Sequence, residues 1–128
     1  MPGERGRRRL DGLSFARTVA ALREDGTLVM ADCGSFEDAQ RAARAGVDIV
    51  ATTLAGYKGD RVKTDGPDLE LLREVVAAFP DVPVICEGRV HTPEQAAAVE
   101  AGAFAVIVGT AITHPTSITT WFKAAVEG

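Results

Sequence analysis

Four apolar segments, separated by stretches of helical character, dominate the pattern of this chain of 128 residues. They are continuous rather than alternating in polarity, which is typical of strands buried on both faces of a parallel sheet. The segments are 27–32 (TLVMAD), 47–53 (VDIVATT), 82–88 (VPVICEG) and 103–110 (AFAVIVGT). We therefore predict four parallel strands.

Helical segments lie between and around these strands. Thr92, Pro93 and Gln95 have the order of an N-cap, a first-turn proline and a capping-box partner. Gly46 and Gly102 follow helix ends, where a left-handed residue is favourable. The predicted helices are 14–24, 36–45, 67–79, 93–101 and 117–127.

An internal repeat narrows the fold class. Residues 35–53 and 92–110 share an N-cap, an Ala-rich helix and a strand that closes on threonine, at an offset of 56 to 57 residues. A (β/α)8 barrel repeats its units in this way, and a doubly wound sheet can do so too. A whole barrel needs eight strands and about 250 residues. We therefore predict an α/β fold that is half of a (β/α)8 barrel with open edge strands, as a single partial domain over 1–128. In it, 1–13 is a loop or tail and 14–128 is one helix followed by four βα units.

Composition excludes several classes of protein. Hydrophobic residues make up 46% and charged residues 25% of the chain, as in ordinary globular proteins. No apolar run approaches the roughly 20 residues of a membrane span, and no apolar segment follows the basic N-terminus, so we expect a cytoplasmic protein. The net charge of −4 argues against general nucleic-acid binding. Cys33 and Cys86 lack the spacing of metal ligands, so we expect two buried thiols and no metal site.

Polar residues collect at the predicted carboxyl ends of the strands, where parallel α/β proteins place their reactive groups. Asp32 and Glu87 fit either an acid–base site or a structural role, as a helix cap or an ion pair. Gly88 and Gly109 fit either a phosphate site made by backbone N–H groups or plain turns. The strand ends are Asp32, Thr52–Thr53, Glu87–Gly88–Arg89 and Gly109–Thr110.

Residues 54–68 form a connection that is too long for a simple turn, which indicates a functional loop or a solvated one. Tyr57 is its best candidate for a substrate contact. His114 lies at the same end of the predicted sheet. Trp121 and Phe122, on the last helix, are predicted to be packing residues.

Five segments occur in a specific order: MADCGSFEDA, GVDIVATTLAGY, PDLELLREV, VPVICEGRVHTPEQA and GAFAVIVGTAITHP. Together they resemble the C-terminal half of the N-acetylmannosamine-6-phosphate 2-epimerases, from about residue 7 onward. The resemblance implies strands five to eight of a (β/α)8 barrel. It also implies interconversion of N-acetylmannosamine 6-phosphate and N-acetylglucosamine 6-phosphate, in amino-sugar and sialic acid catabolism. Proton transfer at C2 of the open-chain sugar would proceed without a metal or an organic cofactor.

The resemblance assigns roles to the strand-end residues. Glu87 matches the family's active-site acid, and Asp32 matches an aspartate that contacts the sugar and positions the acid–base groups. Thr53 and Tyr57 fall in the substrate-binding segment. The phosphate-side residues are Gly88, Arg89, Gly109, Thr110 and His114.

Two departures from the family pattern affect what the chain is expected to do. His114 stands where the family has arginine, and its shorter, partly charged side chain implies weaker phosphate binding. The family's catalytic lysine lies on the third strand, which no segment of this chain matches.

Three interpretations stay open. The chain is half of an epimerase that a complementing N-terminal half-barrel completes, or it is a non-catalytic half-barrel that binds a sugar phosphate or forms a homodimer. A weaker third interpretation is another phosphate-binding barrel enzyme. In each case we expect a small-molecule sugar phosphate as ligand, without nucleic acid or membrane.

Overall fold

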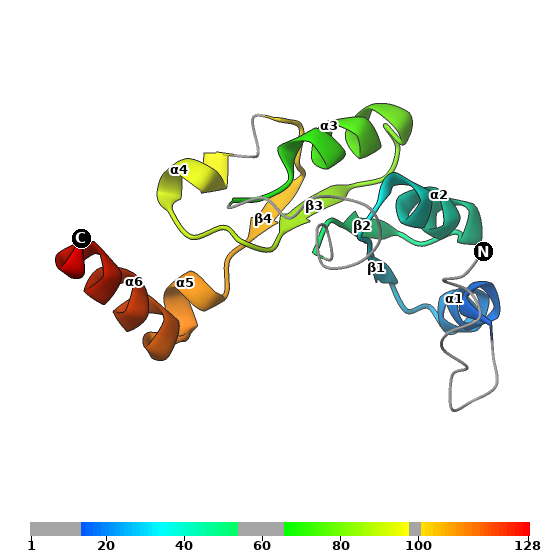
Figure 1. Ribbon diagram of the computed structural model, residues 1–128. Coiled ribbons are helices and arrows are strands. Elements are labelled where there is room, and N and C mark those ends of the chain that lie inside the picture. Colours follow the sequence, from blue (N-terminus) through cyan, green and yellow to red (C-terminus); the bar gives the residue numbers. More distant parts are fainter. Residues whose placement is uncertain (1–13, 54–65, 98–100) are drawn as a thin grey trace.

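The computed structural model describes residues 14–53, 66–97 and 101–128. The predictions for 1–13 and for Tyr57 lie outside these residues. A sheet of four parallel strands runs through the centre, and Figure 1 shows it with helices at its sides. The strands are β1 (Met30–Asp32), β2 (Ile49–Ala51), β3 (Val84–Glu87) and β4 (Ala105–Ile107). The helices are α1 (Phe15–Glu24), α2 (Phe36–Ala45), α3 (Leu69–Ala78), α4 (Pro93–Ala96), α5 (Thr110–Thr113) and α6 (Pro115–Glu127).

The order of the strands in the sheet is the order of the strands in the chain, β1-β2-β3-β4. A doubly wound sheet reverses this order at a switch point, whereas a (β/α)8 barrel adds each new strand to the same edge. The order therefore distinguishes the two folds that the repeat left open. It confirms the prediction of half a barrel, with β1 and β4 at the two edges of the described sheet.

The helix ends follow from local sequence. The Thr92 hydroxyl accepts from the Gln95 amide at 3.1 Å, and the Gln95 side chain accepts from the Thr92 amide at 3.2 Å, which confirms the capping box. Gly46 ends α2 in the left-handed conformation, with φ 89°. Each of the five predicted helices is present, although α4 is shorter than the predicted 93–101.

Helix α5 was not predicted, because Thr110–Thr113 contains mostly β-branched residues that extend the pattern of the strand before it. One turn forms after Gly109, whose carbonyl oxygen accepts from the Thr113 amide at 2.9 Å. None of the helices that the structure describes is long and apolar enough to cross a membrane.

The hydrophobic core lies between the sheet and the helices on one of its sides. Figure 1 shows α2 and α3 along this side. Helix α3 contributes three residues of the core, Leu71, Leu72 and Val75, each at most 1% exposed. Val50 on β2 and Cys86 on β3 are fully buried on the sheet side of the core.

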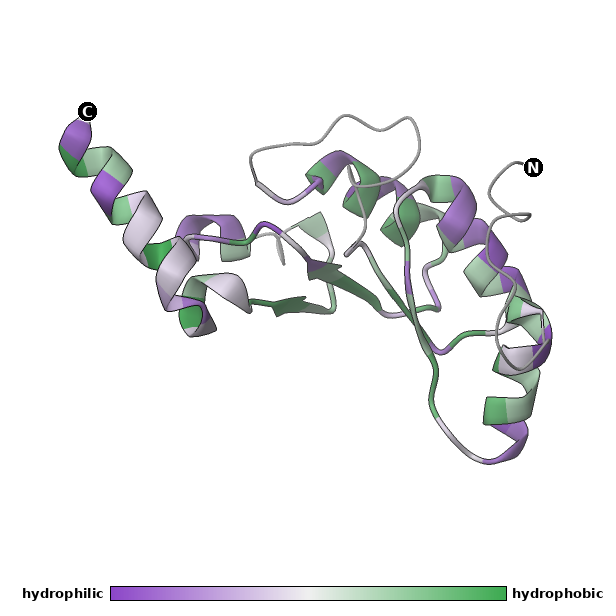
Figure 2. Ribbon diagram, turned by 60° about the horizontal axis from the view of Figure 1, so that its bottom comes forward, coloured by the Kyte–Doolittle hydropathy of each residue, from purple (hydrophilic) through white to green (hydrophobic). Residues whose placement is uncertain are grey.

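The opposite face of the sheet is exposed at its two edge strands. Met30 and Ile107, on the two edge strands, are 44% and 37% exposed, whereas Ala31 next to Met30 is buried. The prediction of strands buried on both faces is therefore wrong for the edge strands β1 and β4, whereas on β2 the successive residues Val50 and Ala51 are both 0% exposed. The apolar strands of a barrel pack on both faces, against the helices outside and against the side chains that fill the barrel interior. The described residues supply the helices of the first layer, which Figure 2 shows beside the hydrophobic strands.

Candidate functional site

Three side chains from neighbouring strands meet at the carboxyl end of the sheet. The Thr53 hydroxyl oxygen lies 2.6 Å from Oε2 of Glu87 and 3.1 Å from Oδ1 of Asp32. Asp32 ends β1, Thr53 follows β2, and Glu87 ends β3. The pairing of Ala51 with Ile85 explains the contact, because two residues further along this register Thr53 stands opposite Glu87. The predicted strand-end residues are thus brought together.

The alternative structural roles of the two carboxylates receive no support from this geometry. The cap of α2 is the Ser35 side chain, which accepts from the Asp38 amide at 3.2 Å, so Asp32 is not needed there. Among the residues that the structure describes, no lysine or arginine forms an ion pair with Glu87. Asp32 is exposed, while Thr53 and Glu87 are half-buried. Two carboxyl groups and the hydroxyl between them can donate and accept hydrogen bonds, and the Asp32 end of this arrangement is exposed to solvent.

Gly88 makes the turn that follows Glu87. Its φ of 100° lies in the left-handed region, which favours glycine. A Cβ atom at this position would lie only 3.1 Å from the carbonyl oxygen of Thr53. The glycine therefore lets the loop after β3 pass against the end of β2, where the hydroxyl bridge lies.

Arg89 is directed toward the segment before α3. It is the only described non-glycine residue with positive φ, at 58°, and its Nε donates to the carbonyl oxygen of Gly66 at 3.1 Å. The predicted phosphate-binding arginine thus joins two loops at the carboxyl end of the sheet.

The loop after β4 carries the remaining predicted phosphate-side residues. Gly109 and Thr110 are exposed at the start of α5. His114 caps α6: its Nδ1 accepts from the Ser117 amide at 3.3 Å and lies 2.6 Å from the Ser117 hydroxyl oxygen. The capping role was missed by sequence reasoning, although Pro115 after it is a known signal of a helix start.

The aromatic residues of α6 divide into two cases. Trp121 is half-buried, and its ring centroid lies 4.4 Å from that of His91, which follows β3. This contact confirms a packing role for Trp121. Phe122 is 71% exposed, so the same prediction is wrong for Phe122 in the described residues. Helix α6 extends away from the sheet (Figure 1).

Both cysteines are free and buried, as expected. Burial raises the pKa of Cys33 from 9.0 to about 12, with smaller contributions from the negative charges of Asp38 and Asp32 and an opposing one from Arg41. Burial also raises the pKa of Cys86, against a hydrogen bond with Thr52. Neither thiol forms a reactive thiolate near neutral pH.

The free energy of unfolding is expected to fall as the pH rises above about 9. Cys33 holds its proton more tightly in the folded chain, with a pKa near 12, than in the unfolded chain, where it is 9.0. Its stabilising contribution is therefore complete below about pH 9 and is lost toward pH 12, at up to about 1.4 kcal/mol per pH unit. Urea unfolding from pH 8 to pH 10.5 measures this slope. The variant Cys33→Ala should have a smaller slope, and an unchanged slope would contradict the assignment.

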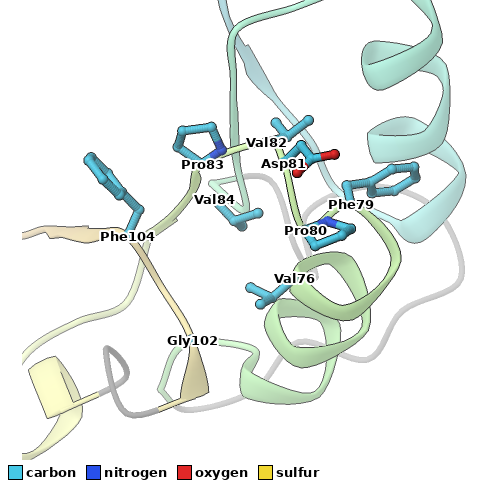
Figure 3. A pocket seen from close by; sticks show the side chains of 9 residues that line it. All are labelled: Val76, Phe79, Pro80, Asp81, Val82, Pro83, Val84, Gly102 and Phe104. Atoms are coloured by element: carbon cyan, nitrogen blue, oxygen red, sulfur yellow. The ribbon is translucent and has the colours of Figure 1, made fainter.

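A shallow hollow lies at the opposite end of the sheet. It has a volume of about 230 Å³, and Figure 3 shows its mostly apolar lining between the end of α3 and the beginnings of β3 and β4. Asp81 is its only charged lining residue. The amino-terminal face of barrel strands contributes stability rather than chemistry, so this hollow is not part of the candidate site. Within the described residues, no group of His, Cys, Asp or Glu side chains is arranged to hold a metal ion.

Comparison with known proteins gives the family. The family model NanE, described as an N-acetylmannosamine-6-phosphate epimerase, matches residues 4–128. The chain belongs to this family. A relative from Cutibacterium acnes, named N-acetylmannosamine-6-phosphate 2-epimerase, is 58% identical over 124 residues, which are 94% of this chain and 54% of the relative. A relative of the same name from Corynebacterium glutamicum is 48% identical over 92% of this chain and 51% of its own length.

One solved structure belongs to the same family, and a second shares the fold. The N-acetylmannosamine-6-phosphate 2-epimerase from Clostridium perfringens superposes with a TM-score of 0.86 at 40% identity, over 94% of this chain and 52% of that one. A mandelate oxidase superposes with a TM-score of 0.62 at 27% identity, over 77% of this chain and 30% of that one. The chain thus spans about half the length of the curated relatives that it matches.

Proposed function

We propose that this chain supplies the C-terminal half of an N-acetylmannosamine-6-phosphate 2-epimerase. The observation that carries the proposal is the contact of Asp32, Thr53 and Glu87 at the carboxyl end of the sheet, in a chain of this family. Epimerisation at C2 needs a proton removed from one face of the open-chain sugar and returned to the other. The C1 carbonyl makes this proton removable, and a carboxyl group at C2 can transfer it.

In the proposed site, Glu87 transfers a proton at C2 and Asp32 contacts the sugar. Thr53 and Tyr57 are assigned to the substrate segment, although Tyr57 lies outside the described residues. Parallel strands β3 and β4 are neighbours, so their following loops lie at one edge of the sheet, which supports a phosphate site between them. The proposed phosphate-side residues are Gly88, Arg89, Gly109, Thr110 and His114.

The partner of this half is proposed to be a complementing N-terminal half-barrel that carries the family's catalytic lysine. The open edges of β1 and β4 and the exposed inner-face residues Met30 and Ile107 support a missing layer. The same observations also favour a second candidate, a non-catalytic half-barrel that pairs with a copy of itself and binds a sugar phosphate. For either candidate we propose a location in the cytoplasm.

Turnover of N-acetylmannosamine 6-phosphate is expected only when the chain is mixed with a fragment carrying the first four βα units of a family member. The reason is that the chain alone offers Asp32 and Glu87 without the lysine. Formation of N-acetylglucosamine 6-phosphate, followed by NMR of the sugar, measures the reaction in each sample and in their mixture.

The controls separate the two candidates. The N-terminal fragment alone should be inactive, and light scattering should show a complex in the mixture. Binding of the sugar phosphate without turnover in any sample would favour the non-catalytic half-barrel. Appreciable turnover by the 128-residue chain alone would contradict the need for the lysine.

A further inference from the structure

The hydroxyl of Thr53 lies between the carboxyl groups of Asp32 and Glu87. Thr53 Oγ1 lies within hydrogen-bond distance of Glu87 at 2.6 Å and of Asp32 at 3.1 Å. A threonine hydroxyl has one hydrogen to donate and two lone pairs that accept. The hydroxyl can therefore donate to one of the carboxyl groups and, whenever the other carries a proton, accept from that one.

The bridge also joins groups with different access to solvent. Asp32 is exposed, whereas Thr53 and Glu87 are half-buried. Asp32 is therefore the more accessible of the two carboxyl groups, and the Thr53 hydroxyl lies between it and Glu87.

The backbone around Thr53 is fixed on both sides. The amide of Thr52 donates to the carbonyl oxygen of Ile85 at 3.0 Å, which continues the pairing of β2 with β3. The carbonyl group of Thr53 itself lies against Gly88. A β-branched side chain has few rotamers, so the hydroxyl is held between the two carboxyl groups by the strand register.

We propose that Thr53 is a positioning residue that passes a proton between Asp32 and Glu87. The O–H bond of the Asp32 carboxyl group breaks as its proton moves to Thr53 Oγ1. The hydroxyl proton moves at the same time to Oε2 of Glu87, so the hydroxyl is restored and the negative charge moves to Asp32. No electron transfer is involved. The assignment rests on the proposed function, in which Glu87 must regain or lose a proton in each catalytic cycle.

The first test uses the chain alone and does not depend on activity. In 13C NMR of selectively labelled protein, Asp32→Asn is expected to displace the carboxyl signal of Glu87, because it removes the acid at the other end of the bridge. This displacement should persist in Thr53→Ser and be largely lost in Thr53→Val, which keeps the shape but lacks the hydroxyl. Thr120→Val is the matched control, since its hydroxyl donates only to the Thr116 carbonyl oxygen on α6. A displacement that persists in Thr53→Val would overturn the proposal, because it would be transmitted through space.

The second test uses the chain completed by an N-terminal half-barrel. Thr53→Val is expected to lower kcat on the order of 10²-fold, with little change in KM, because proton transfer is impaired rather than binding. Thr53→Ser should restore most of kcat. A rise in KM alone would overturn the relay in favour of a substrate contact. An inactive wild-type mixture would contradict the proposed function instead, while the NMR comparison still decides the role of Thr53.

Discussion

Replacement of Glu87 by glutamine in the completed barrel is expected to lower kcat by about 10²- to 10⁴-fold, the usual contribution of a general acid–base residue. Glutamine has nearly the same size, and its amide oxygen can still accept from the Thr53 hydroxyl that now lies 2.6 Å from Glu87. The amide cannot exchange a proton with C2 of the sugar. The expected change is therefore a loss of turnover from a site that keeps its shape.

Steady-state rates of N-acetylmannosamine 6-phosphate epimerisation, with kcat and KM determined separately, measure this effect. KM should change little, because the loss lies in the transition state. The matched control is Glu127→Gln, which removes an exposed glutamate paired with Lys123 at the end of α6. A Glu87→Gln enzyme that retains most of its kcat would exclude Glu87 from the proton transfer and would leave Asp32 as the acid to examine.

The sequence was a good guide to the site because strand ends converge in parallel α/β folds. Apolar runs located all four strands, so Asp32, Thr53 and Glu87 were predicted to lie at one edge of the sheet. The hydrogen bonds among them were not predictable. They depend on the register that pairs Ala51 with Ile85, which the strands acquire only when residues 34 apart in sequence come together.

The residues after β4 show where local patterns fail. Thr110–Thr113 has strand-like composition, yet three backbone hydrogen bonds, to the carbonyl oxygens of Gly109 and Thr110, close it into a helical turn, α5. His114 resembled a ligand for an anion because it occupies a strand-end loop. Its position before Pro115 also makes it the N-cap of α6. The identity of the residue alone does not indicate whether it binds an anion or caps a helix.

The exposed inner face and Phe122 have a common explanation. Amphipathic and apolar patterns identify which side chains need cover, and they do not identify which chain provides it. Ile107 and Phe122 have large apolar side chains of the kind that is usually packed, yet they are 37% and 71% exposed. Their cover is absent from the described half, and the comparisons show that relatives have about twice the length.

Leu71→Ala is expected to lower the free energy of unfolding by about 2–5 kcal/mol, the usual range for a buried leucine reduced to alanine. Leu71 is 0% exposed, and it lies on α3 next to Leu72 in the core behind the sheet. The substitution removes apolar contacts and leaves a cavity that the surrounding strands can only partly close. Because the total free energy of unfolding of a small domain is about 5–15 kcal/mol, the substitution removes a large fraction of it.

Equilibrium urea unfolding of the 128-residue chain, followed by circular dichroism, measures this change. The matched control is Leu28→Ala, the same chemical change at a side chain that is 74% exposed, and its stability should change little. Helix α3 packs against β3, so the loosened core should also disturb the end of that strand. We therefore expect Leu71→Ala to shift the NMR signals of Glu87 even where the chain stays folded. Equal losses of stability in the two variants would contradict the core described for this half-barrel, because they would place Leu71 and Leu28 in similar environments.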